Sequence, residues 1–458
     1  MNEVVNGGGV QVLADDQRRV DAADRLDVST RHAVDGKRLE NGLVHLLGGI
    51  ERVVCDLASA MVQRGHRVSI FISEPLPEKP IYAVDKRVRF VVYAHGGRQK
   101  HLAEFRRQIL ACAPDVCISP AADRRHFPWC AALWNSGIPL VVSEHSTPED
   151  VESRIWNRPE RLAVMAAADA IHMLRTSCLP SLPDTLLDKA HVIPNAVNLP
   201  LLEKSPKDHP IILSMGRLER DKQNHILIDA FAMLAQDFPQ WHLDIWGVGP
   251  EQKRLEKQIQ RLGVGNNAHI RGLTTKPEEC YALADLLCQP SRHEAFPGAV
   301  VESMAARLPV VGFAQCPGVN ELVRHGETGL LAPKMSAESL AETLRPLMQS
   351  AAIREKMGNK GGEAAIPYSP KIVYDAWEAL LQDVILSQGK TNLQEAAFSS
   401  RIHDGQESQK MLRLLQHCMA RPNVLVADGK LLRRLVFSSP WLTRRLRPFY
   451  DWLKGLCR

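Results

Sequence analysis

The sequence has no feature of a membrane-spanning or secreted protein. No apolar run approaches the roughly 20 residues that a membrane-spanning helix requires. The start of the chain has no basic segment followed by an apolar stretch, so we predict no secretion signal. The ten cysteines form no CxxC pair and no zinc-type spacing, which favours buried, reduced thiols. We therefore expect a cytoplasmic protein.

Motifs for metal or covalent chemistry are also missing. The sequence contains no DxD-type metal motif, and no activated nucleophile stands out from it. It has no internal repeat of solenoid period. We expect that the protein requires neither a metal ion nor a cofactor.

The net charge of +5 is unevenly distributed along the chain. Residues 411–458 contain ten Lys and Arg against two Asp, a net charge of +8, which leaves −3 for the remainder. Residues 430–458 interleave arginines with Leu, Val, Phe, Trp and Tyr. This pattern suits an amphipathic segment on an anionic membrane, or a helical cap on the protein's own body. Nucleic acid is not an expected partner.

Short apolar runs alternate with helical patterns over most of the 458 residues. This alternation indicates parallel sheets covered by helices, and the chain is too long for one core. We predict an α/β fold of two Rossmann-like doubly wound domains facing a central cleft, with a basic C-terminal helical extension. The predicted parts are a poorly structured extension (1–25), an N-terminal Rossmann-like acceptor domain (26–195), a linker (196–210), a C-terminal Rossmann-like domain (211–365), a closing helix (366–386) and a basic amphipathic tail (387–458).

A loop with two cations follows the first predicted strand of the second domain. In "LSMGRLERDKQNH", Gly216 lets the chain turn, and Arg217 and Lys222 flank the loop before the next helix. Cations at the carboxyl end of a strand, near a helix N-terminus, suit a phosphate or diphosphate. Taken alone, a loop of this kind more often carries surface charges, paired here with Glu219 and Asp221, than a phosphate site.

The stretch "SRHEAFPGAVVESMAARLPVV" places Glu294 and Glu302 eight residues apart. Pro297 is typical of a first helical turn, so the N–H groups of Gly298 and Ala299 would point at an anion. Carboxylates accept hydrogen bonds from sugar hydroxyls. The setting therefore suits a sugar nucleotide, with one glutamate on the sugar and the other on the ribose, better than a glycosidase pair opposed across roughly 5–10 Å.

These stretches, with "WGVGPEQKRLE", "LPVVGF" and "GVNELVRHGETGLLAP", resemble in order the nucleotide-sugar-binding half of family four glycosyltransferases of the GT-B fold (glycosyl transferases group one). "GGIERVVCDLASAMVQRGHRV" and "VIPNAV" resemble the first half of that family. The resemblance covers about residues 40 to 385. It implies a retaining, metal-independent hexosyl transfer from a nucleoside diphosphate sugar, with a UDP-sugar as the expected donor.

The resemblance also implies roles for individual residues of the second domain. It assigns the diphosphate to Arg217 and Lys222, the transferred sugar to Glu294 and the ribose to Glu302. It further implies backbone contacts to phosphate and sugar from the residues of the helix start, namely Phe296, Pro297, Gly298 and Ala299.

Three residues of the first domain are weaker candidates. His145 in "VVSEHSTPED" ends a predicted strand, where relatives often place a histidine near the transferred sugar. A lone histidine is more often structural than catalytic, and the position of His145 at the strand end brings the two interpretations level. Gly48 and Gly49 open a helix whose N–H groups would approach the donor phosphate or the acceptor. The candidate catalytic residues are therefore Glu294, His145, Arg217 and Lys222.

The sequence departs from the family pattern at two places. Ala295 stands where the family usually has glycine, a mild change unless that residue needs a positive φ. The first strand, in "RLDVSTRHAV", is weakly strand-like, and the insert "DGKRLENGLVHLL" separates it from Gly48. The acceptor side is thus less well defined than the donor side.

Together these features predict transfer of a sugar to a glycan or lipid-linked acceptor in cell-surface polysaccharide or lipopolysaccharide synthesis. We expect the protein in the cytoplasm or peripherally on the inner face of the cell membrane. The alternative is a sugar-nucleotide epimerase on the same architecture, which would release a changed sugar nucleotide without an acceptor.

Overall fold

The computed structural model describes residues 26–28, 49–72, 82–92, 99–121, 126–133, 136–152, 158–198 and 206–387. Gly48, the predicted extension (1–25) and the basic segment (430–458) lie outside these residues. The chain divides into two compact units. It passes from the first to the second between Ile193 and Pro194, and returns between Asp375 and Ala376.

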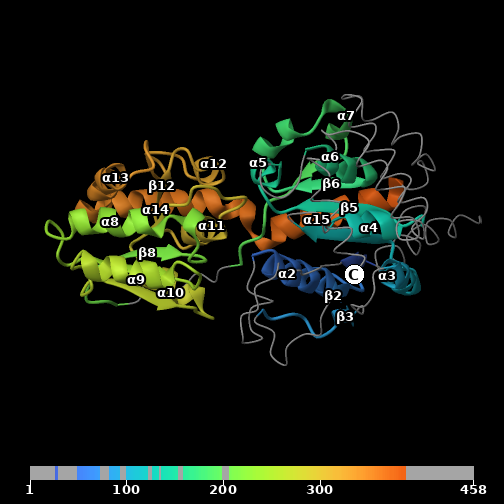
Figure 1. Cartoon of the computed structure of the whole chain (residues 1–458), viewed down its shortest axis with the longest axis horizontal. Coiled ribbons are helices and arrows are strands. Elements are labelled where there is room, and N and C mark those ends of the chain that lie inside the picture. Colours follow the sequence, from blue (N-terminus) through green and yellow to red (C-terminus); the bar gives the residue numbers. More distant parts are fainter. Residues whose placement is uncertain are drawn as a thin grey trace, which may run out of the picture. The chain divides into compact units, whose positions relative to one another are not determined.

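The first unit contains a parallel sheet of five strands in the order β1-β4-β5-β6-β7 (Figure 1). Their bounds are Leu26–Val28, Val116–Ala121, Leu140–Glu144, Ala170–Met173 and Ala190–Val192. A separate parallel pair consists of β2 (Ser69–Ile72) and β3 (Arg89–Val92). The helices are α2 (Gly49–Gln63), α3 (Gln99–Cys112), α4 (His126–Leu133), α5 (Pro148–Asp150), α6 (Arg158–Ala167) and α7 (Asp184–Leu187), with the 3₁₀ helix η3 (Thr176–Ser181).

The amphipathic pattern of α2 accounts for its position in the first unit. Val54, Leu57 and Met61 recur at helical spacing and are buried. Gly65, with a φ of +98°, lies in the turn that follows the helix, where a left-handed backbone favours glycine. The strand β1, weakly indicated by its sequence, is three residues long and pairs with β4.

The second unit contains a six-stranded parallel sheet in the order β10-β9-β8-β11-β12-β13 (Figure 1). The strands, from β8 to β13, are Ile211–Met215, His242–Trp246, Ala268–Gly272, Leu286–Gln289, Val310–Phe313 and Gly329–Ala332. The helices are α8 (Asn224–Leu234), α9 (Gln252–Arg261), α10 (Pro277–Leu283), α11 (Gly298–Ala305), α12 (Val319–Leu322), α13 (Ala337–Gln349) and α14 (Ala351–Ala365), with the 3₁₀ helices η4 (Arg220–Lys222) and η5 (Ile366–Tyr368).

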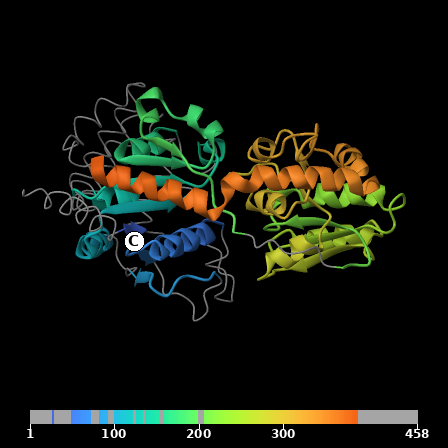
Figure 2. The same ribbon diagram turned by 180° about the vertical axis from the view of Figure 1, so that it is seen from behind.

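Helices pack against one another over this sheet. The helix α8 packs against α13, and α11 packs against α14. The long helix α15 (Pro370–Ser387) follows α14 through η5, as the orange run in Figure 2 shows. The predicted α/β class with two parallel, Rossmann-like sheets is therefore confirmed. Within the part of the chain that the structure describes, none of the helices has the length and apolarity needed to cross a membrane.

Candidate functional site

The strand order of the second sheet reverses between β8 and β11. The strands β9 and β10 lie beyond β8, whereas β12 and β13 lie beyond β11. Doubly wound proteins bind ligands outside the carboxyl ends of their strands at such a reversal. Arg217 and Lys222 follow β8, and Glu294 follows β11. The fold thus places both predicted loops of the second unit at the expected ligand position.

Lys222 and Glu294 form an ion pair at this position, with 2.6 Å between Nζ and Oε1. Gln289 Nε2 and Ser291 Oγ donate to the same carboxylate oxygen at 2.8 and 2.7 Å. Burial would raise the pKa of Glu294, but the Lys222 charge and these hydrogen bonds outweigh it, so the pKa lies below its ordinary value. The site therefore holds a buried, ionised carboxylate next to a cation.

Backbone contacts hold the two loops together. The N–H of Arg292 donates to the carbonyl of Asp221 at 2.8 Å, which joins the loop after β11 to the loop after β8. Gln223 adopts a left-handed conformation, with a φ of +50°, between η4 and α8. Ser214 Oγ donates to Asn224 Oδ1 at 3.0 Å and so ties the end of β8 to the start of α8.

Two glycines allow the loops after β8 and β9 to approach closely. Gly216 and Gly247 have φ values of +152° and +148°. A Cβ on Gly247 would lie 1.9 Å from the carbonyl oxygen of Gly216, so no side chain fits there. The sequence-based interpretation of Gly216 as a turning residue agrees with this conformation.

Arg217 has a different environment from Lys222. Its side chain is 62% exposed, and its guanidinium pairs with Glu219 at 2.7 Å. Exposed pairs of this kind contribute about 0–1 kcal/mol, so an anionic ligand can displace the glutamate at little cost. The structure thus buries one of the two predicted cations beside Glu294 and leaves the other at the surface.

Glu302 lies in α11 and is buried. Its Oε2 accepts a hydrogen bond from the Tyr281 hydroxyl at 2.6 Å. The helix α11 begins at Gly298 with Pro297 as its N-cap, one position earlier than a first-turn proline. Phe296 packs near Tyr368, with 5.8 Å between the ring centroids. Because the first N–H groups of a helix have no intrahelical partner, they suit an anion here.

Ala295 does not need a glycine-like backbone. The described non-glycine residues with positive φ are Ala113, Gln223 and Arg307, so the departure from the family pattern at Ala295 causes no strain. The close approach occurs instead at Gly318, whose φ is +84° and whose added Cβ would lie 2.6 Å from the Glu294 carbonyl oxygen.

Sequence reasoning missed four residues of this site. Gln289, Ser291, Tyr281 and Gly318 contact one or the other glutamate. A signal existed only for Gln289, a polar residue at the end of the otherwise apolar strand "LLCQ". Tyr281 could not be found by motif, because it comes from α10, 21 residues before Glu302.

In the first unit, β5 ends at Glu144, so His145 comes directly after the strand that it was predicted to end. Its backbone N–H donates to the Ala121 carbonyl at 3.0 Å, and its Nε2 lies 2.9 Å from Ser143 Oγ. Burial, with His172 and His126 nearby, lowers the pKa of His145 to about 3. The imidazole is therefore neutral near pH 7. Gly49 is the first residue of α2, as expected for an opening glycine.

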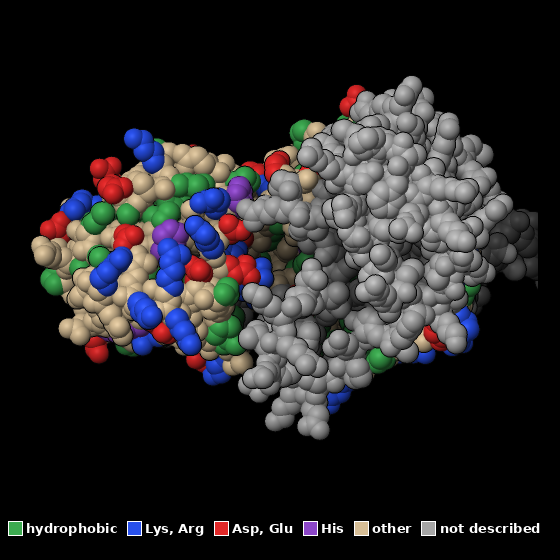
Figure 3. All heavy atoms as spheres, viewed as in Figure 1, with side chains coloured by type: hydrophobic (Ala, Val, Ile, Leu, Met, Phe, Trp, Pro, Cys, Tyr) green, Lys and Arg blue, Asp and Glu red, His purple; other side chains and the backbone are tan. Residues whose placement is uncertain are grey.

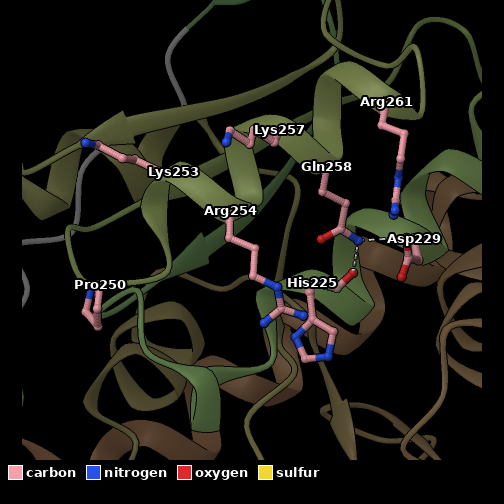
Figure 4. Close-up of a pocket in the computed structure, with 8 residues that line it drawn as sticks. All are labelled: His225, Asp229, Pro250, Lys253, Arg254, Lys257, Gln258 and Arg261. Atoms are coloured by element: carbon pink, nitrogen blue, oxygen red, sulfur yellow. Dashed lines mark hydrogen bonds between the residues drawn. The ribbon is translucent and has the colours of Figure 1, made fainter.

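A cavity of about 610 Å³ lies between α8 and α9, and none of the predicted site residues lines it. In Figure 4, Arg254 and His225 point toward one another, and Gln258 Nε2 donates to the His225 carbonyl and to Asp229 at 2.8 and 2.7 Å. Lys and Arg side chains are conspicuous over this part of the second unit in Figure 3. The remaining lining residues are Pro250, Lys253, Lys257 and Arg261. The cavity is thus separate from the candidate site.

Across the described ranges, no group of three or more His, Cys, Asp or Glu side chains is arranged to hold a metal ion.

Comparison with known families decides the class of the protein. Residues 47–200 match the model of Glycosyltransferase Family 4, and residues 202–364 match that of Glycosyl transferases group 1. The chain belongs to this glycosyltransferase family. The two matches correspond to the two units of the fold, and the second contains Lys222, Glu294 and Glu302.

Relatives of this glycosyltransferase have different names. The chain is 29% identical over 382 residues to an exopolysaccharide phosphotransferase of Streptomyces coelicolor. The alignment covers 74% of the chain but only 40% of the length of that relative. It is 26% identical to an uncharacterized glycosyltransferase of Haemophilus influenzae, over 73% of the chain and 96% of the relative. It is 23% identical to a Campylobacter jejuni N-acetylgalactosaminyltransferase named for an undecaprenol-linked acceptor, over 74% and 96%.

Solved structures share the fold of this glycosyltransferase. Sucrose-phosphate synthase from Thermosynechococcus elongatus has a TM-score of 0.64 at 20% identity, over 79% of the chain and all of the neighbour. Anabaena HepE in complex with UDP has a TM-score of 0.64 at 19% identity, over 78% and 100%. The predicted family and GT-B type of fold are therefore confirmed.

The burial of His172 predicts that the stability of the protein depends on pH. Burial lowers the pKa of His172, which is 1% exposed, to about 4, whereas an unfolded histidine titrates near 6.5. The unfolded chain binds the proton first, so this contribution to stability is present above about pH 6.5 and is lost as the pH falls toward 4. When the pH is lowered from about 7.5 to about 5, the free energy of unfolding should fall in both proteins. We expect the fall to be roughly 2 kcal/mol smaller in His172→Phe than in the parent protein. Urea unfolding at both values measures this, and equal losses would contradict it.

Proposed function

We propose that the protein transfers a sugar from a UDP-sugar to a glycan or lipid-linked acceptor, with retention of the anomeric configuration and without a metal ion. The observation that carries the proposal is the ion pair of Lys222 with the buried Glu294 at the strand-order reversal. Names of relatives support it, since they include transferases of lipopolysaccharide core, poly(glycerol-phosphate) and undecaprenol-linked acceptors. Structural neighbours in complex with UDP and UDP-glucose support the choice of donor.

The proposed donor contacts follow from the charges of the site. The Lys222 ammonium has three N–H donors, so it can contact a β-phosphate while remaining near Glu294. The exposed Arg217 would exchange Glu219 for the diphosphate, and the first N–H groups of α11 would face the same anion. Glu294 would accept hydrogen bonds from hydroxyls of the transferred sugar, and Glu302 from those of the ribose.

In the proposed mechanism the protein stabilises the departing diphosphate and leaves the proton transfer to the substrate. As the bond from the anomeric carbon to the diphosphate oxygen breaks, negative charge grows on that oxygen, next to Lys222 and Arg217. The departing oxygen accepts the proton of the acceptor hydroxyl on the face it leaves, and the new glycosidic bond forms on that same face. In this proposal His145 would orient one of the hydroxyls of the transferred sugar.

The direct test is a panel of nucleotide sugars, screened by thermal shift together with free UDP and GDP. We expect UDP and one UDP-sugar to raise the melting temperature, and we expect the stabilising sugar nucleotide to support transfer in the presence of EDTA. NMR of the product should show the anomeric configuration of the donor. An inverted product, or a changed sugar nucleotide released without an acceptor, would contradict the proposal.

We also propose that residues 430–458 bring the enzyme to an anionic membrane, where lipid-linked acceptors are available. Their arginines suit lipid headgroups and their aromatic residues suit the interface. Full-length protein should float with anionic liposomes at low salt and much less at high salt, because salt screens the attraction. Failure to float at low salt would rule out this role.

A further inference from the structure

A chain of three hydrogen bonds, of which two are buried and the one to His145 is partly buried, starts at His145 in the first unit. Ser143 Oγ lies 2.9 Å from His145 Nε2 and 2.7 Å from His172 Nδ1. His172 Nε2 lies 2.7 Å from the carbonyl oxygen of Ile193. Ser143 and His172 are register partners on the adjacent strands β5 and β6, and each is 1% exposed. The sheet therefore holds both side chains in place.

The acceptor at one end of this series of hydrogen bonds determines which atom donates in each of them. The Ile193 carbonyl can only accept, so His172 carries its hydrogen on Nε2. The neutral His172 ring then has a lone pair on Nδ1, which accepts the Ser143 hydroxyl hydrogen. With its one hydrogen used, Ser143 Oγ accepts from His145, so His145 must carry its hydrogen on Nε2. Its Nδ1 is thereby left with a lone pair.

His172, in this series of hydrogen bonds, contacts the polypeptide near both points where it passes between the units. Ile193 is the last residue before the first crossing, and Trp377 is the second residue after the return. The Trp377 ring packs on the His172 ring with 4.4 Å between centroids, and it is 3% exposed. His172 thus touches one segment by a hydrogen bond and the other by ring packing.

We propose that Ser143 and His172 are positioning residues that hold His145 in the Nε2–H tautomer and tie it to both crossing segments. His145 then presents Nδ1 as a hydrogen-bond acceptor, which suits a substrate hydroxyl and not a phosphate oxygen. That role of Nδ1 rests on the proposed sugar transfer, whereas the tautomer does not. A histidine held in this way orients a hydroxyl and does not act as a proton donor from Nδ1.

The tautomer can be measured without any substrate. Full-length protein labelled with ¹⁵N-histidine gives ring correlations that distinguish the two tautomers, and loss of signals in His145→Gln assigns those of His145. We expect one Nε2–H tautomer in the parent protein and a mixture in Ser143→Ala. An Nδ1–H tautomer in the parent, or an unchanged spectrum in Ser143→Ala, would overturn the proposal.

The neighbouring strand β4 contains a serine that provides a matched control. Ser119, on β4, is 1% exposed and its Oγ lies 3.0 Å from Nδ1 of His126. Ser119→Ala removes a comparable buried Ser–His bond without touching the chain behind His145. Ser119→Ala should lower the free energy of unfolding about as much as Ser143→Ala does, but it should leave the His145 tautomer unchanged.

Substitutions of His172 provide a second measurement should Ser143→Ala not fold. His172→Asn keeps an oxygen acceptor near the position of Nδ1, so the single tautomer of His145 should persist. His172→Phe keeps a ring against Trp377 but has no acceptor, so a mixture is expected. The same tautomer composition in both variants would overturn the proposal.

Measurements of kcat test whether the tautomer of His145 matters for catalysis. We expect Ser143→Ala to lower kcat about tenfold, the scale of one lost hydrogen bond, with the donor KM little changed. Ser119→Ala should keep the parent kcat. Equal losses in the two serine variants would show a merely structural role. If the parent protein transfers no sugar, the proposed function fails, while the tautomer measurement still decides the positioning role.

Discussion

Replacement of Lys222 by alanine is expected to lower kcat/KM about 10²–10³-fold, the usual scale for loss of one group that stabilises transition-state charge. The ammonium lies 2.6 Å from Glu294 and would stabilise the departing diphosphate. Without it, the buried Glu294 carboxylate loses its cation, so the pKa of Glu294 rises. Steady-state kinetics with the identified donor measure the effect. Lys253→Ala, which removes an exposed lysine of the same unit, is the control and should retain parental kcat/KM.

A double-mutant cycle separates the two roles that Lys222 can have. If Lys222 serves only as the partner of Glu294, then Lys222→Ala should cost little in a Glu294→Gln background, where the charge is already absent. If Lys222 contacts the diphosphate, a large part of the loss should persist in that background. An unchanged kcat/KM in Lys222→Ala itself would remove the diphosphate assignment.

The sequence predicted the architecture well because its signals are local. Apolar runs of four to six residues became strands such as β4 and β11, and the amphipathic pattern before Gly65 became α2. The loops after β8 and β11 were identified by their charges and by Pro297. Their meeting, in contrast, depends on the two strands being neighbours in the sheet, which sequence spacing does not contain.

The contacts that tune the site could not be predicted, because they join residues that are far apart in the sequence. Tyr281 reaches Glu302 from α10, and Ser143 meets His172 across two strands, 29 residues away. Each of these residues has an ordinary role when considered alone. Only the register of the sheet or the packing of a helix gives such a side chain its partner.

The largest expected effect on stability comes from Arg161, which is 0% exposed and pairs with Glu144, the residue before His145. Its guanidinium binds both oxygens of Glu144 at 2.7 Å and also contacts Glu152 and Ser181 at 3.0 and 2.9 Å. Arg161→Ala leaves Glu144, 4% exposed, as a buried carboxylate without its cation. Removal of one partner from such a pair costs about 3–5 kcal/mol. Urea unfolding near pH 7, followed by tryptophan fluorescence and circular dichroism, measures the loss.

Burial, and not the geometry of the pair, should decide the size of this loss. Arg107 binds both oxygens of Glu104 at 2.5 and 2.7 Å, but its side chain is 67% exposed. Because water screens this exposed pair, Arg107→Ala should destabilise the protein far less than Arg161→Ala does. Arg161→Met combined with Glu144→Gln should be less destabilising than Arg161→Ala, because no buried charge is left uncompensated. Equal costs for Arg161→Ala and Arg107→Ala would mean that Glu144 gains water or a proton when its partner is lost. Glu144, immediately before His145, would then tolerate the loss of its cation, although its burial predicts a large cost.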